Sequence, residues 1–120
     1  MTELDFDSSV LEQLVDLGDA ADREFLVELV DIFLRDAPTR VQAVIDCASK
    51  GDLEGVERAA HSLKGSAGNL GAVLMRDIAE TLQNASRTHD ETTVSAHAPK
   101  LGPAYAAVES ELRKYLASIT

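Results

Sequence analysis

The sequence contains few of the residues that build disulfide-bonded or loop-rich folds. Its 120 residues include one cysteine, Cys47, so no internal disulfide can form. Tryptophan is absent, aromatic residues make up 4% of the chain, and there are only seven glycines and three prolines. This composition argues against a sandwich or barrel and favours helices. Because Cys47 lies among Val44, Ile45 and Ala48, we interpret it as a small core residue.

Positive charge is also scarce. Eleven lysines and arginines face 21 acidic residues, which gives a formal net charge of −10. An acidic surface repels phosphate backbones and anionic lipid, so we expect no nucleic-acid partner and no membrane partner. The N-terminus lacks the basic and apolar regions of a signal peptide, and no apolar run approaches the roughly 20 residues of a spanning helix. We therefore expect one cytoplasmic domain over residues 1–120, monomeric by default.

Apolar residues recur at helical spacing almost throughout the chain, and no segment alternates with the period of a strand. The pattern predicts a short helix over residues 10–17, ended by Gly18. A long helix follows from about residue 22 to residue 50, and it either kinks at Pro38 or divides there into two. The cation–glycine–acid sequence at residues 50–52 marks a helix end and the next helix start.

Further helices are predicted over residues 53–69 and 72–85. We expect Leu74, Ile78 and Leu82 to point inward, and the first part of the polar segment 86–98 to form a loop. Two prolines near residue 100 are expected to delay or kink a final helix that ends near residue 119. The short connections predict an all-α, up-down antiparallel four-helix bundle with an accessory N-terminal helix.

The helix over residues 53–69 carries two interior glycines, Gly65 and Gly68, although each costs about 0.5–1 kcal/mol relative to alanine. At about 100° per residue, His61 points roughly 120° away from the centre of the apolar stripe and therefore faces outward. Gly65 and Gly68 share that face, and Lys64 borders it. An imidazole with a cation beside it and bare backbone beyond it suits close approach by another protein.

The residue types on this face also suggest chemistry. A neutral imidazole is nucleophilic and can form a covalent intermediate. If His61 accepted a phosphoryl group, Lys64 would offset the new negative charge. His61 and Gln83 lie equally far on either side of a turn centred near Ala72, so Gln83 is a candidate to hydrogen-bond and orient the imidazole. We interpret the other two histidines, His89 and His97, as solvated loop residues.

The run from His61 to Ala67, followed by Leu-Gly-Ala at residues 70–72, resembles the signature of histidine-containing phosphotransfer (HPt) domains. The resemblance implies a four-helix bundle in which His61 is reversibly phosphorylated, on Nε2. It implies that Lys64 assists the phosphorylated state and that Gly65 gives the partner access.

The same resemblance implies the partners. These are response-regulator receiver domains, which supply the phosphorylated aspartate and the Mg²⁺, and a cognate hybrid histidine kinase. The chain itself is expected to hold no metal or cofactor and to lack autonomous kinase activity, because it has no phosphate-binding loop after a strand. The main alternative is a helical adaptor that kept this fold and binds partners without transferring phosphate.

Overall fold

The computed structural model describes residues 20–119, with side chains described for residues 23–118. Within this part of the chain there are five α-helices and no strand. They are α2 (Ala20–Lys50), α3 (Leu53–Asn69), α4 (Val73–Arg87), α5 (Glu91–His97) and α6 (Leu101–Ile119), with a 3₁₀ turn, η1 (Ala98–Lys100), before the last helix. The all-α prediction is confirmed. The helix predicted over residues 10–17, with its end at Gly18, lies outside the described residues.

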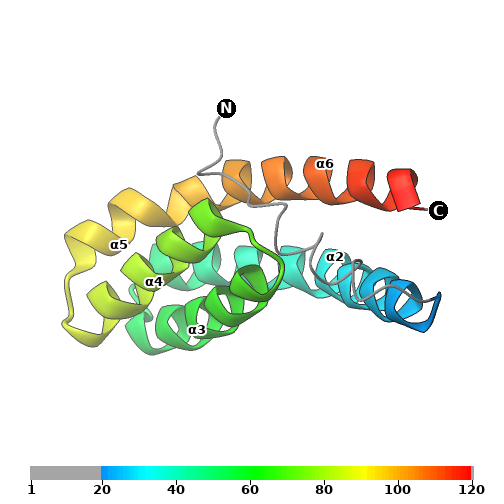
Figure 1. The fold of residues 1–120 in the computed structure, drawn as a ribbon. Helices are drawn as coiled ribbons and strands as arrows, with labels where there is room; N and C mark the ends of the chain where they lie inside the picture. Colours follow the sequence, from blue (N-terminus) through cyan, green and yellow to red (C-terminus); the bar gives the residue numbers. More distant parts are fainter. Residues whose placement is uncertain (1–19, 120) are drawn as a thin grey trace.

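The long helices form an up-down bundle (Figure 1). Helix α2 spans the length of the molecule. Helix α3 packs against α2, and α4 packs against α3 as the second arm of an antiparallel hairpin. Helix α6 then runs back alongside α2 toward the start of that helix. Pro38 lies inside α2, which continues through it, so the alternative of two separate helices is wrong.

Glycines and one aspartate set the two tight connections. Gly51 and Gly71 adopt φ angles of +73° and +78°, a left-handed conformation that glycine adopts without steric cost. Asp52 caps α3, because its Oδ1 accepts a hydrogen bond of 3.0 Å from the backbone N–H of Gly55. These features place α3 and α4 side by side with short links, as the sequence predicts.

The core lies between α2, α3, α4 and α6. Helix α6 is held on α2 by Tyr105, whose ring centroid lies 6.0 Å from that of Phe33. The Tyr105 hydroxyl also donates a hydrogen bond to the Leu34 carbonyl. Cys47 is half-buried and packs against the core rather than inside it. The largest fully buried side chains are Leu26, Leu63, Leu70, Met75, Leu82, Leu101 and Leu112.

The loop predicted for the first part of segment 86–98 is confirmed at residues 88–90, but it is shorter than expected and the rest of the segment is helical. Helix α4 continues to Arg87, and α5 begins at Glu91 because Asp90 caps it by accepting a hydrogen bond from the backbone N–H of Thr93. His89 does lie in the exposed turn, at a φ of +57°. His97 is instead half-buried at the end of α5, with Nδ1 2.9 Å from the Thr93 carbonyl oxygen.

Two further expectations concern Leu74 and the prolines near residue 100. Leu74 does not point into the core but is 37% exposed, because it lies in the first turn of α4, at the edge of the hairpin. The prolines near residue 100 delay the start of α6 rather than interrupting it, because α6 begins at Leu101 and continues through Pro103 to Ile119. Pro99 lies in η1, and Pro103 is in the first turn of α6, where a backbone N–H has no helical partner to lose.

Candidate functional site

His61 stands on the outer face of α3. Its side chain is exposed, whereas Ala60, Leu63 and Ala67 on the opposite face are fully buried. The inner face anchors the helix against α2 and α4, and the outer face is free to present the imidazole. The orientation of His61 predicted from helical periodicity is therefore the orientation in the structure.

The imidazole is held by a buried amide on the neighbouring helix. Gln83 is only 2% exposed, and its Nε2 lies 2.9 Å from Nδ1 of His61. The contact arises because α3 and α4 run antiparallel about a turn at Ala72, which brings residues 11 positions before and after it to the same height. The hydrogen bond expected between Gln83 and His61 is present.

The amide orientation of Gln83 determines which ring nitrogen carries the proton. When the amide nitrogen faces Nδ1, it donates, and the proton of a neutral imidazole lies on Nε2. Gln83 Oε1 is buried and makes no hydrogen bond to the described residues. A 180° rotation of the amide exchanges the two atoms, so that Nδ1–H donates to Oε1 and Nε2 keeps its lone pair. In both orientations Gln83 occupies Nδ1 and leaves Nε2 as the outward nitrogen.

The residues that follow His61 differ from one another in accessibility. A Cβ added at Gly65 would meet nothing within 4 Å, so this backbone is open, as expected. Gly68 is not open. A Cβ there would lie 3.4 Å from Cδ of Arg76, because the Arg76 side chain crosses it from α4. The prediction of bare backbone holds for Gly65 and is wrong for Gly68.

Lys64 is at the site but is not a free cation. Its Nζ lies 3.4 Å from Oε1 of Glu80 on α4, and the two side chains are 39% and 52% exposed. On the other side of His61, Nε of Arg87 donates to Oε2 of Glu57 at 2.8 Å. Sequence reasoning missed both carboxylates and Arg87. The spacing about Ala72 that suggested Gln83 could have identified them, because 64 with 80 and 57 with 87 are equally spaced pairs.

Comparison with known proteins shows the family to which this site belongs. The family model described as Hpt domain matches residues 28–119, which include His61 and the elements that hold it. The chain belongs to the Hpt domain family. The expected histidine phosphotransfer function in two-component phosphorelays is thereby confirmed at the level of the family.

Two individual proteins are similar to this Hpt domain. Multistep phosphorelay regulator 1 of Schizosaccharomyces pombe (strain 972 / ATCC 24843) is 32% identical over 78 residues, which are 65% of this chain and 26% of that protein. The match thus spans about a quarter of the length of the relative. The crystal structure of histidine-containing phosphotransfer protein B from Pseudomonas aeruginosa PAO1 superimposes with a TM-score of 0.84 at 23% identity. This match covers 95% of this chain and 96% of that one, and it confirms the bundle fold.

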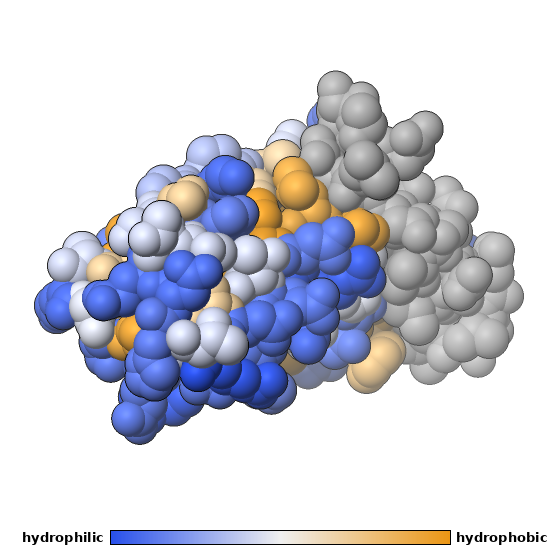
Figure 2. Space-filling model, turned by 90° about the vertical axis from the view of Figure 1, so that its left-hand side faces the viewer, coloured by the Kyte–Doolittle hydropathy of each residue, from blue (hydrophilic) through white to orange (hydrophobic). Residues whose placement is uncertain are grey.

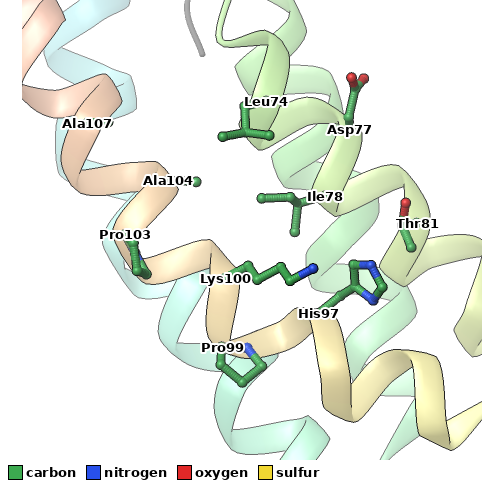
Figure 3. Close-up of a pocket in the computed structure, with 10 residues that line it drawn as sticks. All are labelled: Leu74, Asp77, Ile78, Thr81, His97, Pro99, Lys100, Pro103, Ala104 and Ala107. Atoms are coloured by element: carbon green, nitrogen blue, oxygen red, sulfur yellow. The ribbon is translucent and has the colours of Figure 1, made fainter. Parts of the chain in front are cut away.

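The site of this Hpt domain is a shallow hollow of about 530 Å³ around the imidazole, lined by charged and polar side chains. A larger hollow of about 650 Å³ lies between α4 and α6, where Leu74 and Ile78 face Ala104 across an apolar floor (Figure 3). Its α4 residues are about 120–180° around the helix from Gln83, so it opens on another face of the domain. The chemistry therefore does not lie at this larger hollow.

In Figure 2 most of the described surface at the α5 end is hydrophilic, with one larger hydrophobic area and several small ones. Among residues 20–119 no group of three or more histidine, cysteine, aspartate or glutamate side chains could hold a metal ion. None of the helices described combines the length and apolar character needed to cross a membrane.

Proposed function

We propose that His61 accepts a phosphoryl group from the aspartyl phosphate of one response-regulator receiver domain and passes it to another. One observation carries the proposal: the imidazole is exposed and lines an open hollow, and Gln83 occupies Nδ1, so Nε2 is the ring nitrogen left for a partner. A nucleophile needs a free lone pair and room for the incoming group. Nε2 has both when the Gln83 amide is rotated so that its Oε1, otherwise buried without a partner among the described residues, accepts a hydrogen bond from Nδ1–H.

The transfer step follows from this geometry. The Nε2 lone pair attacks phosphorus, and a P–N bond forms while the P–O bond to the receiver carboxylate breaks. The carboxylate leaves with the bonding electron pair, and the ring becomes a phosphorylated imidazolium that keeps its proton on Nδ1. The Gln83 amide in its rotated orientation accepts a hydrogen bond from that Nδ1–H and so favours the nucleophilic tautomer. Transfer to the second receiver reverses these changes.

The neighbouring residues support the step in different ways. Lys64 places its ammonium beside the developing negative charge. The open backbone at Gly65 lets the receiver bring its aspartate close to Nε2. In this proposal the receiver holds the Mg²⁺, and a hybrid histidine kinase supplies the phosphoryl group to the receiver. The chain acts as a monomeric carrier without cofactor or kinase activity of its own. The name of the S. pombe relative, a multistep phosphorelay regulator, supports this assignment.

The test is transfer of label from a phosphorylated receiver in the presence of Mg²⁺. An acid-labile, base-stable adduct is expected on the wild-type chain and none on His61→Gln, with helical content unchanged. The chain has only three histidines, so His89→Gln and His97→Gln are matched controls that should still be labelled. Label that persists in His61→Gln would show that the site is assigned to the wrong residue.

The same assay separates carrier, kinase and adaptor. A wild-type chain that binds receivers but takes no label would be a binding-only adaptor. Label acquired from ATP alone, without a kinase, would contradict the carrier role.

The role of Gln83 has its own measurement. In Gln83→Ala the Nδ1 partner is lost, so ¹⁵N NMR should show a mixture of His61 tautomers, and transfer should slow by about tenfold. A wild-type tautomer ratio and rate in this variant would remove Gln83 from the mechanism.

A further inference from the structure

Two ion pairs flank the His61–Gln83 hydrogen bond, one on each side. All three contacts join α3 to α4, and their members lie 15, 11 and 8 positions from Ala72 in the order 57–87, 61–83 and 64–80. At 1.5 Å per residue the ion pairs start about 6 Å and about 4.5 Å along α3 from His61. Both are therefore within about one helical turn of the reacting imidazole.

The two pairs have opposite polarity. In one, α3 supplies the carboxylate of Glu57 and α4 supplies the guanidinium of Arg87, at 2.8 Å. In the other, α3 supplies the ammonium of Lys64 and α4 supplies the carboxylate of Glu80, at 3.4 Å. A cation thus stands on each side of His61, on a long and partly exposed side chain, and each is already neutralised by a carboxylate.

A phosphoryl group on Nε2 would compete for these cations. It adds negative oxygens above the ring, at a distance that lysine and arginine side chains can reach by changing rotamer. A cation that turns to the phosphoryl group leaves its carboxylate unpaired beside a new negative charge. The stability of the phosphorylated state then depends on how strongly Glu57 and Glu80 hold their partners.

We propose that Glu57 and Glu80 are positioning residues. Through their ion pairs with Arg87 and Lys64, they set the equilibrium of phosphoryl transfer to His61. While His61 is free, they neutralise the two cations. Once His61 is phosphorylated, they compete with the phosphoryl group for them. This competition limits the stability of the phosphohistidine and keeps transfer back to a receiver favourable. The inference rests on the proposed phosphorylation of His61.

The experiment measures two quantities for the full chain: the equilibrium constant for transfer between a phosphorylated receiver and His61, and the hydrolysis half-life of the phosphohistidine. Glu57→Gln and Glu80→Gln should each shift the equilibrium toward phosphorylated His61 and lengthen the half-life. The expected change is about two- to fivefold in each, the range that partly exposed ion pairs contribute. The pairs share no partner, so the double variant should show the product of the two effects.

Glu109→Gln is the matched control. Its carboxylate lies 3.0 Å from Arg113 on α6, and these side chains are 37% and 62% exposed, against 36% and 55% for Glu57 and Arg87. The control therefore breaks a similar ion pair and removes the same charge away from α3 and α4. It should leave the equilibrium constant and the half-life at their wild-type values.

A double-mutant cycle tests whether Glu57 acts through Arg87. Arg87→Gln should shift the equilibrium away from His61, and adding Glu57→Gln to it should change nothing further. If Glu57→Gln has its full effect in the Arg87→Gln chain, the carboxylate acts by direct repulsion and the proposal is wrong. Circular dichroism should show unchanged helical content in every variant.

The outcomes also distinguish this inference from the proposed function. If the wild-type chain takes no label on His61, the proposed function fails. If it takes label but Glu57→Gln and Glu80→Gln have wild-type equilibrium constants and half-lives, the proposed function stands. The inference that the two carboxylates compete with the phosphoryl group for Arg87 and Lys64 is then refuted.

Discussion

Replacing Gly65 with alanine should make the domain more stable and slower at its reaction. Gly65 lies inside α3, in a helical conformation with a negative φ, and nothing lies within 4 Å of the position where a Cβ would be added. The methyl group therefore fits without strain and removes the entropic cost of glycine in a helix, about 0.5–1 kcal/mol. For a domain of this size the melting temperature should rise by about 2–5 °C.

The effect on transfer has the opposite sign because Gly65 is one turn from His61 on the same face. The Cβ atoms of residues four apart on a helix lie about 5–6 Å from each other, so the new methyl group occupies the surface that a receiver must approach. Displacement of reacting groups by about 1 Å can cost 100-fold in rate. We expect transfer to slow by about tenfold in Gly65→Ala and on the order of 100-fold in Gly65→Leu.

The assay combines thermal unfolding followed by circular dichroism with the transfer rate from a phosphorylated receiver. Gly102→Ala is the control, since a Cβ there also meets nothing within 4 Å and α6 carries no part of the site. This variant should not lose stability and should transfer at the wild-type rate. Wild-type transfer in Gly65→Leu, or a lower melting temperature in Gly65→Ala, would refute the reasoning.

Three further predictions concern the rest of the fold. Gly55→Ala should destabilise the domain by about 1–3 kcal/mol in urea unfolding, because the new Cβ would lie 2.6 Å from both the Cys47 sulfur and an Asp52 carboxylate oxygen. Burial, with the Asp52 carboxylate, raises the pKa of the Cys47 thiol, so alkylation at pH 8 should be slower than for a free cysteine. Hydrogen bonds from Thr93 lower the pKa of Asp90, so the stability it adds is present at neutral pH and lost as the pH falls below the usual aspartate range. Asp90→Asn should flatten that part of the acid unfolding curve.

The parts of the fold that sequence predicts well are those with several independent signals. Helix α3 begins and ends where predicted, because Asp52 provides a cap at one end and Gly71 a left-handed turn just beyond the other. Helix α5 was missed because Val94 is its only buried apolar residue before η1. Its formation depends on the cap that Asp90 provides. A cap is a signal from one residue, and a search for apolar periodicity does not detect it.

The candidate site also has features that the sequence predicts and features that it does not. The outward direction of His61 follows from the apolar stripe of α3 alone, and the level of Gln83 follows from the turn at Ala72. What periodicity cannot give is the rotation of α4 about its own axis, which decides whether Gln83, Glu80 and Arg87 face α3 or solvent. The structure shows that all three face α3, with Gln83 buried and the two charged residues at the rim.

Gly65 lowers the stability of the domain, and the packing of the rest of α3 offsets that loss. A natural domain is stable by only about 5–15 kcal/mol, so about 0.5–1 kcal/mol lost at Gly65 is a noticeable fraction. The opposite face of the same helix buries Val56, Ala60, Leu63 and Ala67 completely, and a single buried leucine contributes about 1.5–3 kcal/mol relative to leaving it exposed. One helix can therefore keep an open face for a partner because its other face is fully packed. For this reason Leu63→Ala should cost stability, whereas Gly65→Leu should cost transfer.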